Sequence, residues 1–165
     1  MDAFLFQERQ YFRNWIVWIP LLGTDALFIW GLYQQLILGK PWGDNPMGDW
    51  GLLGMSALVF GVTAMFGVMH LNTEIDGEGV RIVFFPMAKR FIPWQEVERA
   101  EVRRYNPILE FGGWGLRFRP NGRAYSVSGR MGLELTLKSG KKVMIGTQEP
   151  EEIGRVVKKL LPAGK

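Results

Sequence analysis

The sequence contains no cysteine and a single histidine, His70. Without cysteine the chain has no disulfides, no thiolate metal ligands and no cysteine nucleophile. With one histidine it has no site that needs two imidazole groups. Three common catalytic or phosphate-binding motifs are also missing, namely H-E-x-x-H, G-x-S-x-G and a Gly-Lys-Ser/Thr loop. We therefore expect a protein that is not an enzyme and that needs no metal and no cofactor.

Charge is scarce in the first 71 residues, which hold three of the 20 Lys and Arg residues and five of the 16 Asp and Glu residues. Within this part, residues 15–38 contain one charged side chain, Asp25, and residues 50–71 contain only His70 at their end. A helix of about 20 apolar residues crosses a bilayer core about 30 Å thick. We expect two transmembrane helices, at about 15–38 and 50–71, joined by a loop rich in Gly, Pro and Asp.

Basic residues flank the outer ends of this hairpin. Arg9 and Arg13 precede the first span, and Arg81, Lys89 and Arg90 follow the second, whereas the loop has one Lys and two Asp. The positive-inside rule then puts both termini in the cytoplasm. No small-residue cleavage site follows the first apolar run, so we expect an uncleaved anchor.

These patterns divide the chain into three parts. Residues 1–14 mix aromatic and charged side chains, and we expect them to lie in the membrane interface as a short amphipathic lead-in. Residues 15–71 form the transmembrane hairpin. Residues 72–165 carry most of the charge and form a cytoplasmic domain.

Asp25 is the one acidic residue near the centre of a span. Such residues are costly in lipid and usually face protein or water. If the hairpin is symmetric about its loop, Asp25 lies level with Thr63. Our hypothesis is a protonated Asp25 that is hydrogen-bonded to Thr63 or to a partner subunit. A proton or ion pathway normally needs more intramembrane polar groups than Thr24, Ser56 and Thr63.

Small residues recur along the second span at spacings of three and four. They form a stripe that lets another helix approach closely, and its members are Gly54, Ala57, Gly61 and Ala64. Two interpretations are open. The stripe packs against the first helix of the same chain, or it contacts another subunit.

From His70 onward the hydrophobic pattern changes to period two, which is typical of strands. We expect strands near residues 69–75, 79–85, 89–93, 97–104, 114–119, 123–128, 132–138 and 142–147. Hairpin turns are indicated at Asp76-Gly77, Pro120-Asn121-Gly122 and Ser139-Gly140.

The chain ends in an expected amphipathic helix that starts at Pro150. Its apolar residues are Ile153, Val156, Val157, Leu160 and Leu161, at the spacing of one helical face. The predicted fold class is α+β: a transmembrane helical hairpin followed by a small antiparallel β-barrel that this helix caps.

Several segments resemble the bacterial pleckstrin-homology-like (PH-like) domain. This resemblance rests on the strand order, the closing helix and residues 92–97 (Ile-Pro-Trp-Gln-Glu-Val). Further segments are similar to an uncharacterised group of bacterial membrane proteins that pair two transmembrane helices with one such domain, namely 111–117 (Phe-Gly-Gly-Trp-Gly-Leu-Arg), 127–129 (Val-Ser-Gly), 145–147 (Ile-Gly-Thr) and 150–152 (Pro-Glu-Glu). The resemblance implies a PH-like barrel at the inner membrane, with no established activity to transfer. The turn Asp76–Gly79 is acidic and short, unlike the basic first loop with which eukaryotic relatives bind phosphoinositides.

Basic residues gather later in the domain. Arg117 and Arg119 share a strand face by alternation, and with Arg123 they form either a basic ridge for lipid or a partner, or an ordinary solvated face. Glycines surround Trp114 on both sides, so we expect a bulge or tight bend with this side chain packed or presented for binding.

Two function classes follow. The first is a non-catalytic interaction protein, an accessory or assembly subunit of a membrane complex whose PH-like domain is a cytoplasmic docking platform. Its partners are other membrane protein subunits or a second copy of the chain. The alternative is a sensor that binds anionic membrane lipids through the basic ridge. Neither class involves nucleic acid.

Overall fold

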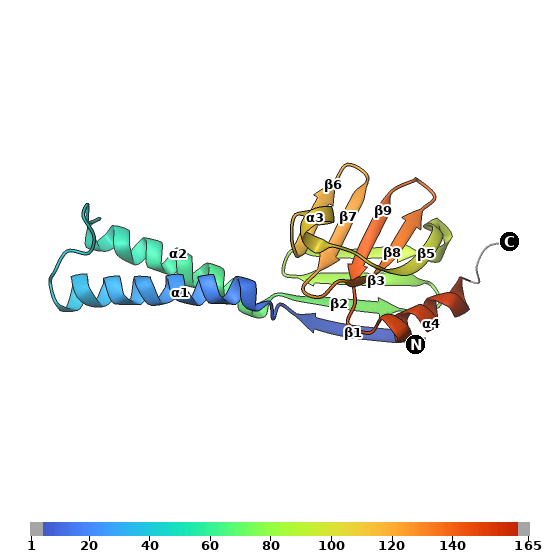
Figure 1. Cartoon of the computed structure of the whole chain (residues 1–165), viewed down its shortest axis with the longest axis horizontal. Helices are drawn as coiled ribbons and strands as arrows, with labels where there is room; N and C mark the ends of the chain where they lie inside the picture. The colour runs from blue at the N-terminus through green and yellow to red at the C-terminus, as the bar shows by residue number, and fades with distance from the viewer. Residues whose placement is uncertain (1–4, 162–165) are drawn as a thin grey trace. The chain divides into compact units, whose positions relative to one another are not determined.

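The computed structural model describes residues 5–161. Residues 1–4 of the expected lead-in and residues 162–165 of the expected domain lie outside the described part. The chain divides into two compact units, namely a helical unit, Arg13–Val68, and a β unit built from the residues before and after it. Figure 1 shows the elements of each unit, with labels on the helices α1 to α4 and on the strands except β4.

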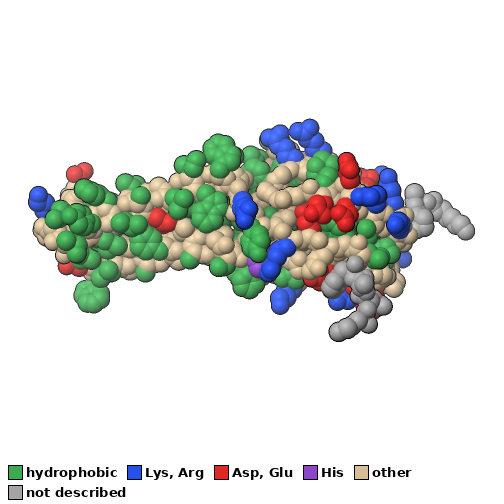
Figure 2. Space-filling model, turned by 90° about the horizontal axis from the view of Figure 1, so that it is seen from below, with side chains coloured by type: hydrophobic (Ala, Val, Ile, Leu, Met, Phe, Trp, Pro, Cys, Tyr) green, Lys and Arg blue, Asp and Glu red, His purple; other side chains and the backbone are tan. Residues whose placement is uncertain are grey.

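Two long helices make up the helical unit. α1 (Trp15–Leu32) begins where the Asn14 side chain accepts a hydrogen bond from the backbone N–H of Ile16. It continues as the π-helical segment η1 (Tyr33–Ile37), and α2 spans Asp49–Val68. Both helical segments are long and apolar enough to cross a membrane. Only 6% of the apolar stretch in the first segment, and 11% in the second, is buried within the protein. In Figure 2 hydrophobic side chains cover much of this unit.

The loop of the helical unit folds back on α1. Trp42 packs edge-on against Phe28 at 5.7 Å between ring centroids. Its indole occupies the space beside Gly31, where an added Cβ would come within 2.6 Å of the ring. Gly31 is therefore the residue that lets this tryptophan reach the helix backbone.

The first sheet of the β unit contains four antiparallel strands in the order β1-β2-β3-β4. They are β1 (Phe6–Tyr11), β2 (His70–Ile75), β3 (Gly79–Phe85) and β4 (Ala88–Pro93). The β2–β3 turn is tight because Oδ1 of Asp76 accepts hydrogen bonds from the backbone N–H groups of Glu78 and Gly79, both at 2.9 Å.

The segment before the helices is a strand of this sheet. β1 pairs with β2 over its whole length, from Phe6 opposite Ile75 to Tyr11 opposite His70. The structure thus differs from the division expected from the sequence, because the β unit includes residues on both sides of the helical unit. Glu8 and Gln10 are buried, so the inward face of β1 carries polar groups.

The second sheet contains five strands in the order β5-β8-β9-β7-β6. Their bounds are β5 (Val97–Arg104), β6 (Gly115–Arg119), β7 (Gly122–Ser126), β8 (Met131–Leu137) and β9 (Lys142–Gly146). A short 3-10 helix, η2 (Trp94–Glu96), precedes β5, and a short helix, α3 (Pro107–Phe111), lies between β5 and β6.

The expected closed antiparallel barrel was wrong. In the part of the chain that the structure describes, the strands form two separate sheets. β9 inserts between β8 and β7, so β7 and β9 run parallel. The close approach needs Gly122, because a Cβ there would overlap the carbonyl oxygen of Lys142. Periodicity predicts strands, but it does not predict these non-local partners.

The core of the β unit lies between the inward faces of the two sheets, which are stacked in Figure 1. Ile82 and Phe84 of β3, and Leu133 and Ile145 of β8 and β9, are fully buried. The C-terminal helix α4 (Pro150–Leu160) buries Ile153 and Val157 and contacts β5, β8 and β1. The sequence predicted this helix and its apolar face.

Candidate functional site

Asp25 and Thr63 join the two helices of the helical unit. The Thr63 hydroxyl donates a hydrogen bond to Oδ1 of Asp25 at 3.1 Å, and the pair is partly buried. Both residues therefore face the neighbouring helix and not the outer surface. A further polar contact of α2 is local, because Ser56 donates to the carbonyl oxygen of Leu52 at 2.7 Å.

The small-residue stripe of α2 lies on a different face from this contact. All four members, Gly54, Ala57, Gly61 and Ala64, are exposed. Apart from the adjacent residues and the nearby backbone of α2 itself, no described atom lies within 4 Å of a Cβ built on Gly54 or Gly61. The residues of α2 that are buried are Leu52 and Ser56. The interpretation in which the stripe packs against the first helix of the same chain therefore does not describe this structure.

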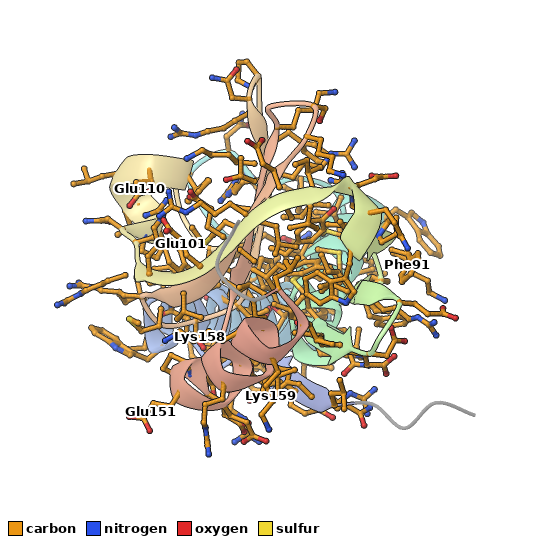
Figure 3. All side chains as sticks on the ribbon, turned by 90° about the vertical axis from the view of Figure 1, so that its right-hand side faces the viewer. Phe91, Glu101, Glu110, Glu151, Lys158 and Lys159 are labelled. Atoms are coloured by element: carbon orange, nitrogen blue, oxygen red, sulfur yellow. The ribbon has the colours of Figure 1, made fainter. Side chains whose placement is uncertain are left out.

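A groove of about 650 Å³ runs between β5 and α4. β5 is an edge strand, since it pairs with β8 on one side only. Small residues keep the groove open, since Ala100 lines it from β5 and Gly154 lines it from α4. A Cβ added to Gly154 would lie 3.5 Å from Cγ2 of Val102. Figure 3 shows α4 below β5, and it labels Glu101 of β5 and Lys158 of α4, two of the charged residues that line the groove.

An ion-pair cluster covers the outer face of the second sheet. The Glu134 side chain is 7% exposed and is bound by Arg103 Nη2 at 2.6 Å and Lys142 Nζ at 2.8 Å. Arg103 also pairs with Glu110 of α3 at 2.9 Å. Burial acts to raise the pKa of Glu134, but the hydrogen bonds from Lys142 and Arg103 outweigh it and lower that pKa. The cluster ties α3 to the sheet.

The three arginines of the predicted ridge lie on two faces of the β6–β7 hairpin. Arg117 stands opposite Ala124 and Arg119 opposite Gly122, so these two share a face. Arg123 stands opposite Phe118, on the other face, with its guanidinium 5.0 Å from the ring centroid. Arg119 and Arg123 nevertheless meet at the end of the hairpin, where both line one pocket.

Trp114 is packed within the β unit. Its indole Nε1 donates a hydrogen bond to the carbonyl oxygen of Gly129 at 3.1 Å, and the side chain is half-buried. Gly112, Gly113 and Gly115 have positive φ angles, so the chain bends here as glycine allows.

The pocket beside Arg119 and Arg123 includes residues that the sequence did not single out. It has a volume of about 460 Å³, and its other cationic side chains are Arg90, Lys141 and Lys142. The sequence held one signal for the position of Arg90, because strand alternation puts this residue on the same face as the apolar Ile92. Among the residues that the structure describes, no group of three or more His, Asp or Glu is arranged to hold a metal ion.

A buried carboxylate links β1 to the start of α4. Glu8 accepts a hydrogen bond from the Thr147 hydroxyl at 2.6 Å and another from the backbone N–H of Gln148 at 2.7 Å. On the same strand face, Gln10 donates to the carbonyl oxygen of Gly146 at 2.8 Å. Burial raises the pKa of Glu8, and the two hydrogen bonds oppose that shift.

Comparison with curated proteins finds no significant match for this chain. Comparison with models of protein families finds one that covers residues 2–162, nearly the whole sequence and both structural units. On the strength of that match, the chain belongs to DUF6141, a family of unknown function.

Proposed function

We propose that this protein is a non-catalytic, membrane-anchored interaction subunit that docks an extended segment of a partner protein between β5 and α4. The observation that carries the proposal is the groove beside the open edge of β5. An edge strand offers unpaired backbone N–H and C=O groups, and an extended peptide can add to it as a further strand. Affinity then comes from the backbone, and side-chain pockets supply specificity.

The groove has the composition that such a peptide needs. Ala100, Val102 and Gly154 give it a small apolar floor. Charged residues stand around this floor on both elements, namely Glu101 on β5 and Glu151, Arg155 and Lys158 on α4. We therefore expect the partner segment to place small apolar side chains inward, and residues of both charge signs outward.

The membrane anchor is the helical unit. Its helices have the length and apolar surface for two spans, and little of that surface is covered by protein. The distribution of basic residues supports an orientation with both termini in the cytoplasm, and the resemblance to bacterial membrane proteins supports the inner membrane as its location. In this orientation the groove faces cytoplasmic partners.

The exposed stripe on α2 supports a partner within the membrane as well. Small residues at spacings of three and four favour close helix–helix contact. Since no other described element comes within 4 Å of a Cβ added at Gly54 or Gly61, we propose that a helix of the partner complex, or a second copy of the chain, packs there.

The PH-like identity is part of the proposal. Its support is the antiparallel first sheet, the second sheet and the single C-terminal helix that packs on β5 and β8. The fold proposed here is an open relative of that domain, in which the strand before the helices completes the first sheet.

The alternative function, a sensor of anionic lipid, was expected to use Arg117, Arg119 and Arg123 as one ridge. The register of β6 and β7 does not favour a continuous ridge, because Arg123 lies on the opposite face. Docking in the groove is therefore the function that we prefer.

Native mass spectrometry of the intact protein tests the proposal. The full chain is purified in mild detergent from its native membrane, together with a Gly154→Leu variant that fills the groove and an Arg117→Gln control outside it. We expect a stoichiometric partner protein with the wild type and the control, and its loss with Gly154→Leu. A lone monomer, or a homo-oligomer that retains only anionic lipid, would overturn the proposal.

A further inference from the structure

A pocket with only basic charges lies at one end of the β unit, where β4 of the first sheet meets the turns of the second. It has a volume of about 460 Å³, within the range of about 300–1,000 Å³ typical of small-molecule sites. Its charged lining consists of five cations, Arg90, Arg119, Arg123, Lys141 and Lys142, and includes no carboxylate.

Two of these cations occupy core-facing positions on different sheets. Arg90 stands opposite Ile82, which is fully buried, and it alternates with buried Ile92. Residues opposite one another in a ladder share a face, so Arg90 lies on the core side of β4. By the same rule Arg123 shares a face with its partner on β9, Val143, which is 1% exposed.

Arg90 is half-buried and Arg123 is exposed, so both charges are open to a ligand that enters the pocket from solvent. Among the described residues, only one of the five pocket cations is in an ion pair, Lys142 with Glu134. Arg119 and Arg123 lie instead against the rings of Phe111 and Phe118. Arg119 also lies close enough to Glu110 for its charge to act on that carboxylate. Among the described residues, the three cations with no carboxylate partner are therefore Arg90, Arg123 and Lys141.

The floor of the pocket is rigid. The two turns that form it are joined where the backbone N–H of Lys142 donates to the carbonyl oxygen of Asn121 at 2.8 Å. Gly122 brings β7 against β9 at the same point. The guanidinium groups of Arg119 and Arg123 also lie against aromatic rings, which limits their motion. Such pre-organisation lowers the entropy cost of binding an anion.

We propose that this pocket binds a phosphate-bearing anion. Guanidinium groups bind phosphate oxygens in a bidentate manner, and lysines add charge-assisted hydrogen bonds. The same chemistry is offered by a soluble phosphorylated compound and by the phosphate of a lipid head group. The pocket shares no residue with the β5–α4 groove, so the inference does not depend on the proposed docking function.

The test uses the full chain in nanodiscs, with inorganic pyrophosphate as the soluble probe. One arm measures pyrophosphate binding in phosphatidylcholine nanodiscs by calorimetry. The other compares lipid retained by the protein from phosphatidylcholine discs with lipid retained from discs that contain phosphatidic acid. Binding in the first arm indicates a soluble ligand, and selective retention in the second indicates a lipid phosphate. Binding in neither arm would overturn the proposal.

Matched variants locate the site. Arg90→Gln with Arg123→Gln removes two pocket charges, and Lys89→Gln with Arg117→Gln removes two charges from the opposite faces of β4 and the β6–β7 hairpin. We expect the first pair to weaken binding by about ten- to a hundredfold, the effect of lost charged hydrogen bonds. The second pair is expected to stay within about twofold, because it leaves those bonds intact. Equal loss in both pairs would contradict the proposal.

A footprint on the wild type keeps the test decisive if the pocket variant unfolds. Lys141 lines the pocket, whereas the exposed Lys138 precedes the same turn and does not. Bound pyrophosphate, or phosphatidic acid, is expected to slow acylation of Lys141 and to leave Lys138 unchanged. If the anion did not slow the acylation of Lys141 relative to that of Lys138, the site would be refuted.

Discussion

The hydroxyl of Thr63 donates a hydrogen bond to Oδ1 of Asp25 at 3.1 Å and links α1 to α2. We expect Thr63→Val and Asp25→Leu each to weaken the helix pair, with a coupling energy of about 0.6–2 kcal/mol, as for interhelical hydrogen bonds in membranes. A double-mutant cycle by reversible denaturation in mixed detergent micelles measures it. Additive effects would show that the bond adds no stability.

Gly31 gives a second test of the helical unit. A side chain at this position meets the Trp42 indole at 2.6 Å, so Gly31→Ala is expected to destabilise the hairpin by about 1–3 kcal/mol through overpacking. The same denaturation assay measures this loss. Adding Trp42→Ala removes the clash and should restore part of the stability, whereas an unchanged loss would mean that the indole is not its cause.

Because of Glu8, we expect the free energy of unfolding to fall as the pH rises. Burial raises its folded-state pKa above the ordinary 4.5, so the folded chain holds the proton more strongly than the unfolded chain does. This stability is fully present below pH 4.5 and is lost as the pH rises through the folded pKa. We expect Glu8→Gln to remove this decline, as measured by denaturant midpoints across pH. The exposed Glu98→Gln is the control and should retain it.

Because of Glu134, we expect the free energy of unfolding to have the opposite pH dependence at lower pH. Its folded pKa lies below 4.5, because Lys142 and Arg103 overcome the effect of burial. The stability that it adds is present above pH 4.5 and is lost as the pH falls through the folded pKa. Glu134→Ala is expected to cost about 1–3 kcal/mol at neutral pH and to flatten acid unfolding of the β unit. If the variant lost stability with falling pH in the same way as the wild type, this role of Glu134 would be excluded.

Local patterns were sufficient to predict β2 to β9 and α4, because alternation and turn residues such as Asp76 and Gly140 act over a few positions. β1 was missed for two reasons. Its partner β2 lies beyond the whole helical unit, and its inward residues include Glu8 and Gln10, which do not resemble a core strand. Their buried polar groups find partners only in the folded β unit, at Thr147 and Gly146.

The site shows the same division between local and non-local information. The sequence singled out Arg119 and Arg123 from one hairpin, and it placed Asp25 level with Thr63 from the symmetry of the helical hairpin. The sequence did not connect Arg90 with Arg119 and Arg123, since the pocket forms only where the two sheets meet. Nor did the sequence identify the residues of the β5–α4 groove, because Ala100 and Gly154 mark an opening only once α4 lies on β5.

Site-specific photocrosslinking in intact native membranes tests the docking claim most directly. A photoreactive residue replaces Ala100 in the groove or, as the control, Arg130, which is exposed and lies outside it. We predict one discrete cross-linked protein from position 100, its loss when Gly154→Leu fills the groove, and no such product from position 130. The same product from both positions, or none from position 100, would contradict docking between β5 and α4.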